Sequence, residues 1–160
     1  MTIFRARFVL FLAALLIAPS FAGAQTIDNK LKGVKKLALT FEPFDADSIK
    51  CGVGEGLLAS AMEREAKAIP VKFDGSVYIF QVRVATLAQP AICFTSADIS
   101  VYRFEEVRLS GDKRDLHAKV IIWENGTILG SSPKTHGRDV ARTMADLMKA
   151  FVNDWRKDNG

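Results

Sequence analysis

The stretch from Cys51 to Cys93 decides the fold, and it reads CGVGEGLLASAMEREAKAIPVKFDGSVYIFQVRVATLAQPAIC. It contains both cysteines of the chain. A helix is predicted over 47–69, because Cys51 and Leu58 lie on one stripe of a 3.6-residue period. A strand is predicted over 91–104, with Cys93 on its smaller, more apolar face. Both thiols then point into one layer, so we expect a Cys51–Cys93 disulfide that ties the helix to the sheet.

The N-terminal residues predict export, and the compartment of an exported protein decides whether its cysteines form a disulfide or remain two buried free thiols. Two arginines precede an uninterrupted apolar run over 8–18, and the residues at 22–24 read Ala-Gly-Ala, as a signal peptidase requires. The run falls short of the roughly 20 apolar residues that span a membrane. Cleavage after Ala24 would remove 1–24 as a signal peptide and leave a periplasmic or secreted protein. In that oxidising compartment the paired cysteines favour the disulfide.

The chain that remains has the size of one domain and little net charge. Two of the 22 basic residues lie in the leader, so 20 basic residues face 18 acidic ones. This balance gives no sign of nucleic-acid binding. Residues 25–33 are polar and read as a flexible lead-in, which leaves 34–160 as a single domain large enough to bury a core.

Alternating apolar residues predict the strands, and turn residues separate them. We expect strands over 37–41, 76–87, 91–104, 118–123 and 127–129, and a last helix that begins at Asp139. The pair Asn125-Gly126 predicts a tight hairpin between the last two strands. A symmetric loop at 88–91 would place Phe80 opposite Ile99. The charged stretch over 105–115 is expected to be a loop or a frayed edge.

These elements predict an α+β fold of two layers. One mainly antiparallel sheet of four to five strands would carry two helices on one face, in the order β-α-β-β-β-β-α. That arrangement buries the apolar stripe of each helix against the apolar face of the sheet.

The order of elements resembles two-layer domains of exported assembly proteins. Examples are the N-terminal domain of the TolB translocation protein and the auxiliary lipoproteins of ABC-type lipid transporters. The Cys51-Gly52 helix start, the second cysteine in a strand and the ending FVNDW over 151–155 resemble small exported proteins of alphaproteobacteria with no assigned activity. The resemblance implies an envelope role and carries over no catalytic residue. The chain lacks the lipid-bearing cysteine of the auxiliary lipoproteins.

Motifs for catalysis and cofactors do not emerge from the residues. The glycines at 52–56 miss the spacing of a dinucleotide or phosphate loop. They are better explained by close packing of the helix on the sheet, or by a regular helix that begins only near Leu57. His117 and His136 are the two histidines of the chain, and they lack a recognisable metal-ligand spacing. We therefore expect no cofactor and no metal. The alternative is a small hydrolase or metal-dependent enzyme that uses His117 or His136. Placement of both histidines within about 5 Å of each other and of a carboxylate would favour it.

The helix-free face of the sheet is the candidate partner surface. It mixes polar residues with aromatic ends, which suits a transient partner or a second copy, although an ordinary hydrated sheet face has the same composition. The residues concerned are Ile79, Gln81, Arg83, Phe94, Asp98 and Tyr102. The sequence thus predicts a soluble, non-catalytic periplasmic protein that binds or scaffolds proteins or other envelope components, with a homodimer as a further hypothesis.

Overall fold

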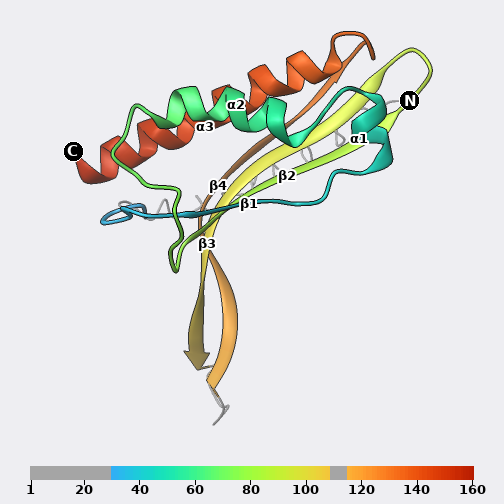
Figure 1. The fold of residues 1–160 in the computed structure, drawn as a ribbon. Helices are drawn as coiled ribbons and strands as arrows, with labels where there is room; N and C mark the ends of the chain where they lie inside the picture. The colour runs from blue at the N-terminus through green and yellow to red at the C-terminus, as the bar shows by residue number, and fades with distance from the viewer. Residues whose placement is uncertain (1–29, 109–114) are drawn as a thin grey trace, which may run out of the picture.

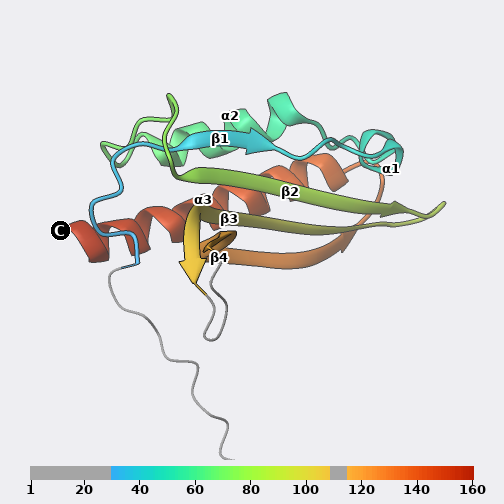
Figure 2. The same ribbon diagram turned by 90° about the horizontal axis from the view of Figure 1, so that it is seen from below.

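The computed structural model describes residues 30–108 and 115–160, so the predicted signal peptide and most of the predicted lead-in lie outside the described residues. The elements in chain order are β1 (Ala38–Phe41), α1 (Ala46–Lys50), α2 (Glu55–Ala66), β2 (Ile79–Ala88), β3 (Cys93–Arg108), β4 (Asp115–Ser131) and α3 (His136–Asn159). Helices α2 and α3 lie side by side on one face of the sheet (Figures 1 and 2).

The four strands form one sheet in the order β1-β2-β3-β4. Strand β1 is parallel to β2, whereas β2, β3 and β4 are antiparallel to their neighbours. The α+β prediction is therefore confirmed, but the sheet is mixed rather than mainly antiparallel. The reason is that the chain leaves β1 through α1 and α2 before it returns to the sheet, and such a helical crossover brings the next strand back in parallel.

The single helix predicted over 47–69 is wrong, because the structure has two helices there. Helix α1 ends at Lys50, with Cys51 as its C-cap, and α2 begins at Glu55. Gly52 between them has φ +74°, a left-handed conformation that glycine adopts without a steric penalty. The apolar residues keep a helical period across this segment, but the left-handed turn at Gly52 divides it into two helices.

The predicted register between β2 and β3 is shifted by two residues. Phe80 lies opposite Val101 rather than Ile99. The connection is displaced because Ala88 remains in β2, and the turn closes with a hydrogen bond of 2.9 Å from the Gln89 N–H to the Ile92 carbonyl. A shift by an even number leaves every side chain on its predicted face.

The hairpin predicted at Asn125-Gly126 is also wrong. Both residues lie inside β4, where Gly126 is opposite Asp98. A Cβ on Gly126 would lie 2.7 Å from the Asp98 Cβ, so this glycine permits close approach of two strands rather than a turn. The two predicted strands are thus one strand, with an irregularity opposite Val101 and Tyr102.

The charged stretch over 105–115 was predicted as a loop or a frayed edge, and its described residues, 105–108 and Asp115, belong to the sheet. Strand β3 pairs with β4 as far as Arg108 and Asp115, although β2 begins only opposite Tyr102. Residues 103–108 and 115–120 therefore form a two-stranded arm that projects from the body, away from the helices (Figure 1). Residues 109–114, between the two strands of the arm, lie outside the described residues.

The core lies between the sheet and the helix layer. Phe80 and Trp123 of the sheet stack edge-on against Phe151 of α3, with ring centroids 5.1 and 5.3 Å apart. The described end of the predicted lead-in is attached to the same helix: Leu31 is buried, and its N–H donates to the Asp158 carboxylate at 2.9 Å. Helix α3 thus holds both the sheet and the N-terminal segment.

Candidate functional site

The two cysteines form a disulfide at one end of the sheet. Cys51 caps the C-terminus of α1, Cys93 begins β3, and their Cα atoms are 6.2 Å apart. Both residues are buried. The predicted bond is confirmed, but it anchors the turn between α1 and α2 rather than the first part of one long helix. As a disulfide, it provides neither a nucleophilic thiolate nor a metal ligand.

The two histidines lie in different parts of the molecule. His117 is exposed on the arm, where its Nε2 lies 3.7 Å from a carboxylate oxygen of Glu106. His136 is buried at the start of α3, beyond Ser131, which pairs with Cys93. Glu106 and Cys93 are 13 residues apart on β3, which is roughly 43 Å of extended strand. The placement of both histidines that would favour the enzyme alternative is therefore absent from the described residues.

His136 takes part in a buried chain of hydrogen bonds. Its Nε2 lies 2.6 Å from the Thr95 hydroxyl, and its Nδ1 lies 2.8 Å from the Ser131 hydroxyl. The Thr95 hydroxyl also forms a hydrogen bond of 2.8 Å with the Thr86 hydroxyl, and the Ser48 hydroxyl of α1 donates to the Thr86 hydroxyl at 2.9 Å. Burial lowers the pKa of His136 and keeps the ring neutral, with one nitrogen as donor and the other as acceptor. This chain joins α1, β2, β3, β4 and α3.

Nothing in this chain of polar groups calls for a ligand. Among the described residues, no buried side-chain nitrogen or oxygen lacks a hydrogen-bond partner. The Asp139 carboxylate accepts hydrogen bonds from Thr135 and Ser131, which lower its pKa, rather than from the imidazole. Within the described ranges there is also no group of three or more potential metal ligands. The histidine network is best explained by the fold it connects.

The predicted partner surface does lie on one face of the sheet, but its residues differ in accessibility. Arg83 and Asp98 neutralise each other through an ion pair of 2.9 Å. Tyr102 is nearly buried, because Lys119 lies over its ring at 3.9 Å and Phe104 packs against its edge. One exposed apolar part of this face lies near the disulfide, and its members are Leu87, Phe94 and Ile128.

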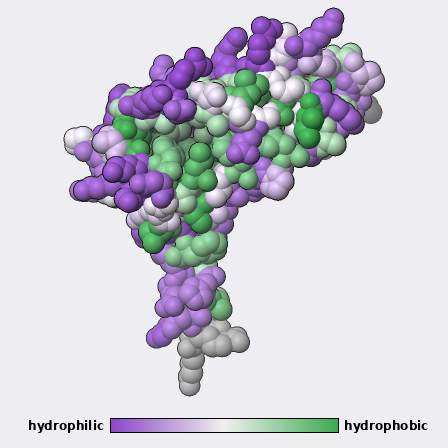
Figure 3. All heavy atoms as spheres, viewed as in Figure 1, coloured by the Kyte–Doolittle hydropathy of each residue, from purple (hydrophilic) through white to green (hydrophobic). Residues whose placement is uncertain are grey.

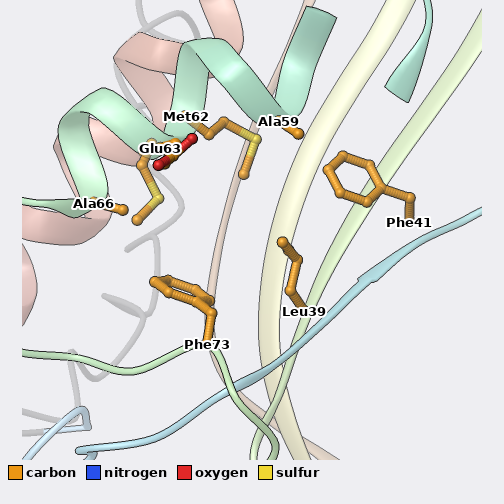
Figure 4. A pocket seen from close by; sticks show the side chains of 8 residues that line it. Leu39, Phe41, Ala59, Met62, Glu63, Ala66 and Phe73 are labelled. Carbon is orange, nitrogen blue, oxygen red and sulfur yellow. The ribbon is translucent and has the colours of Figure 1, made fainter. Parts of the chain in front are cut away.

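A pocket on the other side of β1 was not predicted. Leu39 and Phe41 of β1 point toward α2, and the hollow between them and the helix has a volume of about 260 Å³ (Figure 4). Its lining consists of Leu39, Phe41, Ala59, Met62, Glu63, Ala66, Phe73 and Met148. In the space-filling view hydrophobic side chains reach the surface in this region, below the hydrophilic outer side of the helices (Figure 3).

Small residues on α2 create this pocket. Ala59 and Ala66 are two turns apart on the helix, so they lie on one side of it, and their short side chains leave space above β1. Phe73 closes one end and packs edge-on against Phe80 of the core. The ionisable group at the rim, Glu63, is exposed and pairs with Lys67 at 3.1 Å. The pocket therefore offers apolar contact without a buried charge.

Comparisons with known proteins do not identify the chain. No family model matches it. No curated protein matches it either. Among solved structures, a minor lipoprotein from Acinetobacter baumannii aligns with 76% of this chain and 90% of its own, at 11% identity and a TM-score of 0.40. A likeness at this level carries no argument. In the described residues, no helix is long and apolar enough to cross a membrane.

Proposed function

We propose that this protein is an extracytoplasmic binding domain of the cell envelope, and that its pocket between β1 and α2 takes an apolar group from a partner. The single observation that carries the proposal is the apolar lining of that pocket, in which Leu39 remains 40% exposed although the site faces the core layer. The disulfide supports an oxidising compartment, as does the predicted signal peptide.

The size and chemistry of the pocket favour a side chain or a short aliphatic end over a cofactor. Its volume of about 260 Å³ lies just below the roughly 300–1,000 Å³ of sites that enclose drug-sized molecules. A buried aliphatic group would contribute about 25 cal/mol per Å² of apolar surface removed from water. Because the rim carboxylate of Glu63 is exposed and paired, the pocket contains no group poised for acid–base work.

A pocket-filling variant tests the proposal. Anilinonaphthalene sulfonate, which fluoresces at apolar sites, should bind the folded protein, and Ala59→Leu should remove most of that fluorescence by filling the hollow. Ile49→Ser is the matched control, because Ile49 is exposed on α1 and does not line the pocket. Equal fluorescence for the wild type and Ala59→Leu, or a loss only with Ile49→Ser, would overturn the proposal.

The helix-free face is a second candidate for contact with a protein partner or a second copy. Leu87, Phe94 and Ile128 are 54%, 43% and 75% exposed, and they gather near the disulfide. Light scattering tests the second copy: Phe94→Ser should reduce self-association if this face forms a dimer. A particle mass that stays monomeric at all concentrations would contradict the dimer.

A further inference from the structure

Strand β1 has a free edge beside the pocket. The Ala38 N–H donates to the Tyr78 carbonyl at 2.9 Å, and the Glu42 N–H donates to the Val82 carbonyl at 3.0 Å. Backbone groups of a strand point alternately to its two sides, and in parallel pairing both groups of one residue point the same way. The N–H and C=O of Leu39 and Phe41 therefore point away from β2, and no described strand lies beyond them.

Another segment of the same chain already forms hydrogen bonds with the part of this edge that precedes Leu39. The Leu37 N–H donates to the Lys72 carbonyl at 2.8 Å, and the Gly75 N–H donates to the Leu37 carbonyl at 3.2 Å. Residues 72–75 thus lie along β1 as a short extended segment, and Phe73 of that segment forms one end of the pocket. The free edge at Leu39 and Phe41 continues this pairing along the same strand.

The two residues with free backbone groups are also those whose side chains form one wall of the pocket (Figure 4). A strand added at this edge would place every second side chain on the same face as Leu39 and Phe41, which is the face of the hollow. We propose that the β1 edge and the pocket together bind an extended peptide segment of a partner, with apolar side chains at alternate positions. This inference rests on the proposed function and names its ligand class.

The geometry favours a peptide over a second copy or a lipid. The free edge offers the backbone groups of two residues, whereas a stable protein interface buries about 1,200 Å² or more. A second copy joined through this edge alone would fall short of that area. An acyl chain could fill the hollow but would leave the N–H and C=O groups at the edge without partners. A peptide uses both features and needs only one or two anchoring side chains.

Alternate backbone methylation of a probe peptide tests strand addition separately from pocket filling. The probe is a blocked, fluorescently labelled peptide, Lys-Thr-Leu-Thr-Leu-Thr-Lys. One derivative carries N-methyl groups on both leucines, and the other carries them on two threonines. Because alternate amides face β1, one derivative should lose at least about tenfold in affinity and the other less than about twofold. Antiparallel addition predicts the loss for methylated leucines, and parallel addition predicts it for methylated threonines.

Variants of the protein complete the test. Leu39→Pro removes an N–H that β2 does not use, and Leu39→Ala is its control for the lost side chain, so the proline variant should bind the probe more weakly. The inference is overturned if both methylated peptides bind like the parent, or if the parent peptide does not bind. If anilinonaphthalene sulfonate still reports the pocket in that case, the proposed function stands without strand addition. A dimer that Leu39→Pro dissociates would assign the edge to a second copy and would also overturn the inference.

Discussion

Gly137 contacts the backbone of Gly52 so closely that a Cβ on Gly137 would lie 2.1 Å from the Gly52 carbonyl oxygen. The first turn of α3 therefore rests directly on the turn between α1 and α2, beside the disulfide. Together with the hydrogen bonds of His136, this contact joins the beginning and the end of the domain at one place.

Two glycine-to-alanine substitutions should have opposite effects on the free energy of unfolding. Gly137→Ala should lower the free energy of unfolding by about 1–3 kcal/mol or more, because the obstacle is backbone and cannot rotate away. Gly56→Ala should raise it by up to about 1 kcal/mol, because Gly56 lies in α2 with open space around it. Urea unfolding measures both. An unchanged midpoint for Gly137→Ala would contradict the close contact.

Removal of the disulfide should destabilise the protein without changing its fold. The bond closes a loop with a sequence separation of 42, which corresponds to about 4 kcal/mol in the chain-entropy account. The variant with both Cys51→Ala and Cys93→Ala should lose about 2–5 kcal/mol, and reduction of the wild type should give a similar loss. Equal unfolding midpoints for the oxidised and reduced wild type would show that the bond adds no stability.

His136 should make the stability depend on pH. Burial lowers its pKa in the folded state, whereas in the unfolded chain its pKa is about 6.5. Below that value the unfolded chain binds a proton that the folded protein resists, so stability is retained above about pH 6.5 and falls as the pH decreases, by at most about 1.4 kcal/mol per pH unit.

Substitution of this histidine should remove that dependence. His136→Gln should be less stable at about pH 7.5 but should vary less between about pH 7.5 and about pH 5. His117→Gln is the control, because His117 is exposed on the arm and its replacement should leave the wild-type dependence unchanged. A pH dependence that His136→Gln does not alter would assign the effect to another group.

The two glycines of β4 should differ in their tolerance of alanine. At Gly126 a Cβ meets the Cβ and backbone of Asp98, whereas at Gly130 it meets ring carbons of Phe94 at 2.9 Å. The Phe94 ring is partly exposed and can rotate, so Gly130→Ala should cost less than the roughly 1–3 kcal/mol expected for Gly126→Ala. Thermal unfolding compares them. The reverse order would contradict the close pairing at Asp98.

The sequence predicted the elements and faces of the sheet better than their connections. Alternation placed Phe80 and Val82 on the helix side and Arg83 on the other, because burial of one face fixes that period. The pair Asn125-Gly126 led to the wrong prediction of a hairpin, because a glycine that lets two strands approach closely cannot be told from a turn glycine by its neighbours in the sequence. The break at Gly52 overrode the helical stripe because the left-handed turn is a local requirement.

The pocket could not be predicted in the same way. Its walls come from β1, α2, the segment before β2 and α3, so it exists only after these elements pack together. The available signal was the pair Ala59 and Ala66 opposite the larger residues Leu39 and Phe41, which has meaning only once α2 is known to cover β1. The parallel pairing of β1 with β2 could not be predicted either, because it depends on how α1 and α2 carry the chain from one strand to the other.

Methionine methyl signals in nuclear magnetic resonance test the central claim most directly. Met62 and Met148 line the pocket, whereas Met144 is fully buried outside its lining. With carbon-labelled methionine methyl groups, titration with n-hexanol should move the signals of Met62 and Met148 to saturation and leave that of Met144 in place. If no signal saturates, or if Met144 moves as far as the other two, the hollow beside β1 is not a binding site for apolar groups.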